Sequence, residues 1–274
     1  MMQRTDCRVG MHPPPKWRSP LTEEDEMCGV IGRQVGDRRM TTRWKRLILG
    51  AVLAGVTLAW TQPASAETYK RRLSWSGYTW KVRLAKRENP GNNTWGHSTA
   101  NVRVQSDGTL RMAISTGRPW KSVELAGVRR LGYGRYRWVV NTDLSNPSDV
   151  IALFVRDMSV LSASRGEQDI EFARWSAYDI NPGWFVSWTK GRRTFDSFAM
   201  TNRAPYVVEI TWRRRDVRFY VRDADGTVLL DQTLGARTAG RLLYPRMSYW
   251  LLPSSSSDVP PAPVILDSFR FTRL

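Results

Sequence analysis

The chain of 274 residues has few of the side chains on which many catalytic and metal sites depend. Its two cysteines, Cys7 and Cys28, both precede Glu67, so the part from Glu67 to Leu274 contains no disulfide framework. That part has one histidine, His97. A zinc site of the usual type is therefore not expected, and Ser–His–Asp or Cys–His chemistry has too few partners. We interpret His97 as structural or as a residue at the edge of a cleft.

Long amphipathic helices and a glycine-rich phosphate loop are also missing, because no helical pattern follows Gly132 and Gly134. Instead, short runs rich in Val, Ile, Tyr, Phe and Trp are bounded by Gly, Asn, Asp or Pro, which is typical of strands. We predict strands at 82–84, 100–104, 109–115, 122–128, 134–140, 150–155, 169–174, 185–190, 207–212, 217–223, 228–233, 246–251 and 265–272. So many short strands predict a single all-β sandwich or jelly roll.

The region before Glu67 has the pattern of a secretory signal peptide. Basic residues at 43, 45 and 46 precede an apolar run of 14 residues from Leu47 to Trp60, and an Ala-Ser-Ala sequence ends at Ala66. A membrane-spanning helix needs about 20 apolar residues, so an uncleaved anchor is the weaker alternative. We expect residues 40–66 to be removed after Ala66, leaving no membrane span, and the protein to be secreted to the periplasm or the medium.

Residues 1–39 do not belong to that pattern, because Met40 is a natural start for a signal peptide. They combine Pro13-Pro14-Pro15 with an acidic run at 23–26 and show no sustained periodicity. We interpret them as a translated upstream region or a disordered extension. The remaining domain, residues 67–274, is long enough for one self-sufficient core, and we expect a monomer.

The domain is strongly basic, with 32 Lys and Arg against 19 Asp and Glu, a net charge of +13. Such a charge favours acidic partners. However, only five of the 32 are lysine, the arginines are spread over all predicted strands, and the run at 213–215 falls between two of them. We therefore do not expect nucleic-acid binding, whereas an anionic glycan or cell-wall substrate stays open.

Three carboxylates alternate along one predicted strand, at Glu167, Asp169 and Glu171. Side chains alternate between the faces of a strand, so these three share one face and Gln168 and Ile170 the other. One interpretation is a solvated acidic face. The other is glycoside hydrolysis, in which a retaining enzyme uses two carboxyl groups about 5–5.5 Å apart. Glu167 and Glu171 have Cα atoms roughly 13 Å apart on a straight strand, so their side chains would have to lean together over a curved one.

This stretch resembles the catalytic signature of glycoside hydrolase family 16, E-x-D-x-E, and other parts of residues 73–273 resemble that family in the same order. The matching segments are Pro90–Trp95, Leu131–Trp138, Val208–Trp212, Val217–Val221 and Val264–Phe271. The resemblance implies a concanavalin A-like jelly roll of two antiparallel sheets. It also implies a glycosidase that acts on β-linked polysaccharide, namely β-1,3-glucan, mixed β-1,3-1,4-glucan or galactan, with retention and without a required cofactor.

By the same resemblance, Glu167 is the nucleophile, Glu171 the general acid/base, and Asp169 the residue that keeps their pKa values apart. Two neighbours matter to these roles. Gln168 stands where the family usually has an apolar residue, so we expect imperfect packing there or a partner for its amide. Arg165 would lower the pKa of Glu167, which suits a nucleophile.

Sugar rings stack on aromatic side chains, and the chain has 13 tryptophans. Trp175 is the best stacking candidate, because it shares its parity with the three carboxylates. The other residues expected along the cleft are Asn93, Trp95, Arg174, Trp184, Trp188 and Trp250. We expect Trp138 and Trp212 to lie in the core instead. Asp267 matches a position that contributes to a structural calcium in family members, so a calcium ion near Asp267 is a further expectation.

Two other functions remain open. A non-catalytic carbohydrate-binding domain has the same fold but no need for three carboxylates in register. A basic structural protein of the cell wall or matrix would bind anionic envelope polymers, and salt would release it.

Overall fold

A computed structural model describes residues 67–115, 119–158, 166–175, 180–189, 191–235, 242–252 and 261–274. Every regular element in these ranges is a strand, which confirms the all-β prediction. The strands are β1 (Tyr69–Trp75), β2 (Tyr78–Arg83), β3 (Ala85–Glu88), β4 (Asn93–Trp95), β5 (Val102–Val104), β6 (Leu110–Met112), β7 (Lys121–Gly127), β8 (Gly134–Val140), β9 (Val150–Asp157), β10 (Gly166–Phe172), β11 (Gly183–Thr189), β12 (Arg192–Phe198), β13 (Tyr206–Trp212), β14 (Asp216–Arg222), β15 (Val228–Gly235), β16 (Leu243–Trp250) and β17 (Val264–Arg273).

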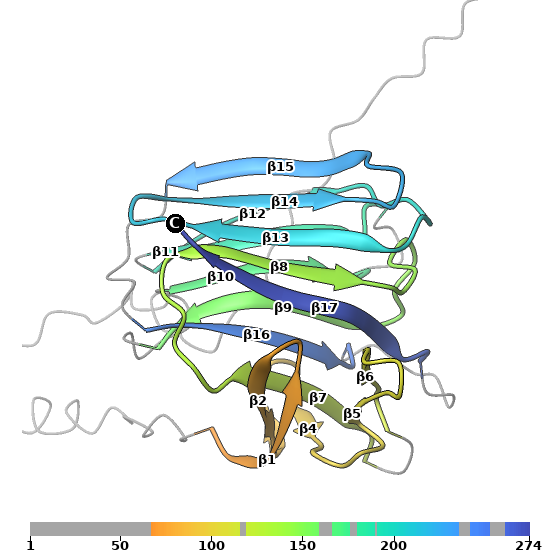
Figure 1. Ribbon diagram of the computed structural model, residues 1–274. Helices are drawn as coiled ribbons and strands as arrows, with labels where there is room; N and C mark the ends of the chain where they lie inside the picture. Colours follow the sequence, from red (N-terminus) through yellow and green to blue (C-terminus); the bar gives the residue numbers. More distant parts are fainter. Residues whose placement is uncertain are drawn as a thin grey trace, which may run out of the picture. The chain divides into compact units, whose positions relative to one another are not determined.

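The strands form two stacked sheets, with β9 to β12 behind β8, β13 and β17 in Figure 1. The larger sheet has the order β1-β2-β7-β16-β9-β10-β11-β12, and β3 and β4 join it through β7. The smaller sheet has the order β15-β14-β13-β8-β17-β6-β5. The pairing of β4 with β7 is parallel, and the other recorded strand pairs are antiparallel. This architecture confirms the predicted jelly-roll sandwich of two antiparallel sheets.

The core lies between the sheets, because each sheet turns one set of alternate side chains toward the other. In β8, Tyr136, Trp138 and Val140 are fully buried. In β10, Ile170 and Phe172 point into the same core. Trp138 and Trp212 have no exposed surface, which confirms that these two tryptophans are core residues.

Four strands were not predicted from the sequence, namely β1, β3, β4 and β12. The strands β1 and β12 are the two edges of the larger sheet, and both carry several charged residues. Charged residues at an edge protect it from pairing with another chain, and they also remove the apolar alternation by which a strand is recognised.

Some expectations lie outside the described residues. These are the signal peptide at 40–66, the segment 1–39 and Arg165. Within the described ranges, no helix is long and apolar enough to cross a membrane.

Candidate active site

The larger sheet turns its other face away from the core, and the three carboxylates lie on this outer face. On β10, Glu167 is paired with Arg156 of β9 and Trp188 of β11. Two residues on, Asp169 is paired with Phe154 and Val186, and Glu171 is paired with Ala152 and Trp184. Because Ile170 and Phe172 fill the core, the alternation of the strand directs the carboxylates outward together.

Burial disfavours the ionised form of all three carboxyl groups. It raises the pKa of Glu171 to about 7, helped by the negative charge of Glu167. Asp169 is 5% exposed, and burial together with the flanking Glu167 and Glu171 raises its pKa well above the usual range. The three carboxyls, one buried and two partly buried, therefore hold their protons to higher pH than free carboxyls do, the condition in which one can act as an acid while another is a base.

A guanidinium does face Glu167, but it comes from the neighbouring strand. Arg156 places Nε 3.8 Å from Oε2 of Glu167. Burial still raises the pKa of Glu167, although Arg156 and Arg246 act against it. The pKa of Glu167 is thus raised overall. The lowering expected from Arg165 concerns a residue outside the described ranges and stays a prediction.

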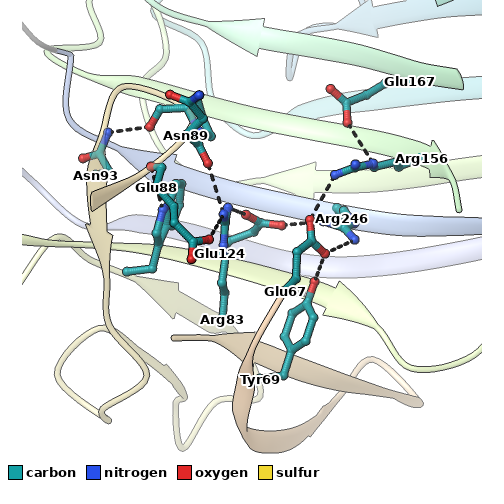
Figure 2. Close-up of polar contacts among 12 residues, drawn as sticks. Glu67, Tyr69, Arg83, Glu88, Asn89, Asn93, Glu124, Arg156, Glu167 and Arg246 are labelled. Carbon is teal, nitrogen blue, oxygen red and sulfur yellow. Dashed lines mark hydrogen bonds and ion pairs between the residues drawn. The ribbon is translucent and has the colours of Figure 1, made fainter. Parts of the chain in front are cut away.

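Arg156 belongs to a chain of alternating charges that crosses the outer face (Figure 2). Its Nη1 donates to Oε1 of Glu67 at 3.0 Å. Arg246 of β16 donates two hydrogen bonds to the same carboxylate, of 2.9 Å and 2.6 Å. The Tyr69 hydroxyl adds a third donor at 2.7 Å. Although burial alone would raise it, Arg246 holds the pKa of Glu67 at about 2, so Glu67 is ionised at neutral pH.

The same chain of charges continues toward β2 and β7. Arg246 also donates to Glu124 at 2.8 Å, and Glu124 accepts from Arg83 at 2.6 Å. Arg83 donates in turn to Glu88 at 2.9 Å. The side chains of Arg246 and Glu124 are 2% and 3% exposed, so these are buried ion pairs joined into one network. Each charge has an opposite partner, which is what makes such burial tolerable.

Three of the tryptophans expected along the cleft gather in one small cluster. Trp175 packs on Trp250 with ring centroids 5.8 Å apart, and Trp95 belongs to the same cluster. Trp175 is partly exposed, whereas Trp250 is 5% exposed and Trp95 is fully buried. Trp95 and Trp250 therefore offer almost no ring surface to a sugar, and Trp175 is the one partly exposed tryptophan of this cluster.

Asn93 and Arg174 take different places around this cluster. The Asn93 amide is buried, donates to the carbonyls of Pro90 and Leu251, and accepts from the Ser122 hydroxyl. It therefore ties β4 to β7 and to the end of β16. Arg174 is exposed and donates to Oδ1 of Asn146 at 2.7 Å.

An aromatic stripe with one guanidinium lies on the opposite side of β10. Trp188 and Trp184 of β11 are partly exposed, and Phe195 of β12 is 45% exposed. The Arg193 guanidinium lies 4.2 Å from the centroid of Phe195 and 5.6 Å from that of Trp188. Sequence reasoning missed Phe195 and Arg193 because β12 was not recognised. The sequence of β12 offers no apolar alternation as a signal, because its two phenylalanines, Phe195 and Phe198, are three residues apart.

Gln168 is the one polar side chain that β10 turns into the core. It is fully buried, its Nε2 has a weak bond of 3.4 Å to the Trp188 carbonyl, and its Oε1 has no hydrogen-bond partner among the described residues. Of the two alternatives expected from the sequence, a partner is therefore found for the amide nitrogen, and the amide oxygen stays unsatisfied.

Replacing Gln168 by methionine is expected to stabilise the protein by about 1–2 kcal/mol. Methionine has nearly the same length, and it removes a buried acceptor whose desolvation costs about 1–3 kcal/mol. Urea unfolding of the parent and of Gln168→Met measures the difference. A loss of stability would show that the Gln168 amide has a partner beyond the described residues.

The expected calcium site rests on Asp267, which lies at a bulge of β17 between Leu266 and Ser268. No group of three or more His, Cys, Asp or Glu side chains within the described ranges is arranged to hold a metal ion. Calcium prefers six to eight oxygens, so most ligands at Asp267 would have to be backbone carbonyls. Calcium binding there stays a prediction.

Several solved structures share this architecture, and some of them are glucanases. No known family profile matches the chain, and no curated protein matches it in sequence. The β-glucanase of Bacillus licheniformis superposes with a TM-score of 0.58 at 18% identity, over 77% of this chain and 99% of that one. A family 16 glycosyl hydrolase from Mycobacterium smegmatis gives 0.55 at 17% identity, over 75% and 100%. The fold is that of the family 16 glycoside hydrolases.

A third similar structure differs in its activity. The immunostimulatory antigen and pseudo β-1,3-glucanase of Mycobacterium tuberculosis superposes with a TM-score of 0.54 at 15% identity, over 71% of this chain and 91% of that one. The family 16 fold therefore accommodates both a β-glucanase and a pseudo-glucanase. The function of this chain has to be argued from its own side chains.

Proposed function

We propose that this protein is a secreted, retaining glycoside hydrolase that cleaves β-linked polysaccharide. The observation that carries the proposal is the row of Glu167, Asp169 and Glu171 on the outer face of β10, where burial raises all three pKa values. Three neighbouring carboxylates, of which Asp169 is buried and Glu167 and Glu171 are partly buried, are costly for a fold. Their arrangement has a use in a reaction that needs one ionised and one protonated carboxyl near neutral pH.

In this mechanism Glu167 attacks the anomeric carbon while Glu171 protonates the departing glycosidic oxygen. The product of the first step is a glycosyl-enzyme ester on Glu167. Glu171, now ionised, takes a proton from water, and that water attacks the same carbon and releases Glu167. Asp169 lies between the two on the strand and shares their protons. The chemistry uses carboxyl groups and water alone, so no cofactor is required.

The substrate would lie across β9 to β12, with sugar rings on the partly exposed aromatics. Trp175 lies at one side of the carboxylate row, and Trp184, Trp188 and Phe195 lie at the other. Sugar rings present apolar C–H faces that such aromatics bind. Arg193 would contact hydroxyl or acidic groups of the same glycan.

The test is reducing-sugar release by the parent protein and by Glu167→Gln. The panel contains β-1,3-glucan, mixed β-1,3-1,4-glucan, galactan and an anionic polysaccharide. Release by the parent alone supports the proposal and names the glycan and linkage. Equal binding of a glycan by both proteins without release would instead indicate a non-catalytic carbohydrate-binding domain, the second function that the fold accommodates.

Hydrolysis is expected to follow a bell-shaped pH profile. The first step needs a protonated Glu171, so activity should fall as pH rises through about 7, where this carboxyl ionises. It also needs an ionised Glu167, whose raised pKa places the acid limb above the ordinary range of glutamate. Measuring kcat/KM against pH checks both limbs. A rate that stays constant well above pH 7 would contradict the role of Glu171.

Secretion belongs to the same proposal, because polysaccharide substrates lie outside the cytoplasm. Cleavage after Ala66 would leave Glu67 as the first residue of a monomeric protein. N-terminal sequencing of the exported protein checks this.

A further inference from the structure

The outer face contains a second carboxylate that competes with Glu167 for the same arginine. Arg156 lies between Glu67 and Glu167 in Figure 2. Its Nη1 donates to Glu67 at 3.0 Å, while its Nε stays 3.8 Å from Oε2 of Glu167. A separation of 3.8 Å is too long for a hydrogen bond. The Nε atom of Arg156 is buried and has no hydrogen-bond partner among the described residues.

In this arrangement Arg156 lies close to Glu167 but forms no hydrogen bond to it. An unpaired buried donor is costly, and a guanidinium forms its strongest bonds to a carboxylate with two parallel N–H groups. Arg156 would therefore be expected to close on Glu167 unless something holds it. The hydrogen bond from Arg156 to Glu67 supplies that restraint.

Glu67 is itself firmly anchored. Arg246, whose side chain is 2% exposed, donates two hydrogen bonds to the Glu67 carboxylate, and the Tyr69 hydroxyl donates a third. Arg246 is in turn held by Glu124. Glu67 therefore acts as a fixed anion, with Arg156 on one side and the buried network on the other.

We propose that Glu67 is a positioning residue for Glu167, because its carboxylate holds Arg156 back from a closed ion pair with the nucleophile. This rests on the proposed role of Glu167 in glycoside hydrolysis. A carboxylate that accepts two hydrogen bonds from a guanidinium is stabilised in the ground state and is a poorer nucleophile. With Arg156 held at its present distance, Glu167 stays ionisable but keeps its lone pairs free for the anomeric carbon.

Several other charged groups face Glu167 and also influence its pKa. Asp169 and Glu171 lie on its own strand, Arg156 on β9, Glu124 on β7, Arg246 on β16, and Glu67 precedes β1. The positive charge of Arg193 on β12 opposes the rise in the pKa values of Asp169 and Glu171. Among these groups, Glu67 is the one that bonds directly to Arg156. Glu67 also directly follows the expected cleavage point at Ala66, so cleavage one residue later would remove this carboxylate.

The first test needs no catalysis. Carbon-13 NMR titration of labelled glutamate carboxyls, with Glu167 assigned by comparison with Glu167→Gln, measures the pKa of Glu167 in the full-length protein. In Glu67→Gln this pKa is expected to fall, because a negative neighbour is lost and Arg156 closes on Glu167. Glu67→Asp keeps the charge and should restore much of the parent value. A pKa of Glu167 unchanged in Glu67→Gln would overturn the proposal, whatever happens to stability.

The second test is kinetic, on the glycan that the parent cleaves. Glu67→Gln should shift the acid limb of the pH profile to lower pH and lower kcat about tenfold, with little change in KM. Glu88→Gln is the matched control, because it removes a carboxylate from the far end of the network, at Arg83. It should leave the acid limb of the pH profile and kcat unchanged. A Glu67→Gln variant with lower stability but a parental pH profile would make Glu67 merely structural. If the parent cleaves no glycan, the proposed function fails, while the NMR titration still decides whether Glu67 controls Glu167.

Discussion

Replacing Glu167 by alanine is expected to reduce sugar release to the background of the assay, because no group remains to form the glycosyl-enzyme. Replacing Glu171 by alanine should slow it by about 10² to 10⁴, the usual contribution of a general acid/base. This second loss should shrink with an aryl β-glycoside whose leaving group needs no proton. That difference between substrates separates the two roles even before products are analysed.

Added azide is expected to distinguish the two carboxyls by the configuration of the product. In Glu171→Ala, the glycosyl-enzyme still forms on Glu167, and azide replaces the water that Glu171 would activate, giving a β-glycosyl azide. In Glu167→Ala, azide takes the place of the nucleophile and gives an α-glycosyl azide. Proton NMR of the products reads the configuration. The opposite pair of products would exchange the two roles, and parental activity in either variant would contradict both.

Misfolding is not expected to confuse these results. Because burial raises the pKa of both carboxyls, ionising them near neutral pH costs stability, and removing either charge should leave the protein at least as stable. Thermal unfolding above pH 7 checks this. Asp231→Asn, on the exposed strand β15, is a matched carboxyl replacement that should change neither activity nor product configuration.

Replacing Arg246 by methionine is expected to lower the free energy of unfolding by about 3–5 kcal/mol, the usual result of removing one partner from a buried ion pair. Arg246 binds both Glu67 and Glu124, and all three side chains are mostly buried. Methionine fills similar space but leaves two carboxylates without their shared cation. Urea unfolding at neutral pH measures the loss.

The loss should depend on pH with a defined sign. Arg246 lowers the pKa of Glu67 to about 2, so its stabilisation is complete above the usual glutamate pKa of about 4.3 and disappears as pH falls toward 2. The parent and Arg246→Met should therefore converge in stability at acidic pH. A gap that stays constant with pH would mean that the packing of Arg246, rather than its charge, is responsible.

Arg218→Met provides the control for this second prediction. Arg218 forms two hydrogen bonds to Asp231, at 2.6 Å and 2.7 Å, but the two side chains are 38% and 46% exposed. Exposed ion pairs contribute about 0–1 kcal/mol, so this variant should lose at most about 1 kcal/mol. If Arg218→Met lost as much stability as Arg246→Met, burial of the Arg246 ion pairs would not explain the larger loss expected there.

The alternation of residues along single strands carried most of the correct sequence predictions. The bounds predicted for β8 agree with the structure, because the buried Tyr136, Trp138 and Val140 alternate with less buried residues, two of them arginines. The edge strands β1 and β12 were missed because their charged residues interrupt any apolar alternation. Because β12 was not recognised, Phe195 and Arg193 were not identified as site residues. Because β1 was not recognised, the surroundings of Glu67 were not identified either.

The sequence by itself determined that the chain is an all-β sandwich and that Glu167, Asp169 and Glu171 point to one face. Both follow from a local rule, the two-residue repeat of a strand. Only the tertiary structure decided what surrounds those carboxylates. Glu67 and Arg246 are 179 residues apart, and Arg156 reaches Glu167 because β9 and β10 pair in one register. Such contacts depend on strand order and register, which many distant residues set together, so no local pattern contains them.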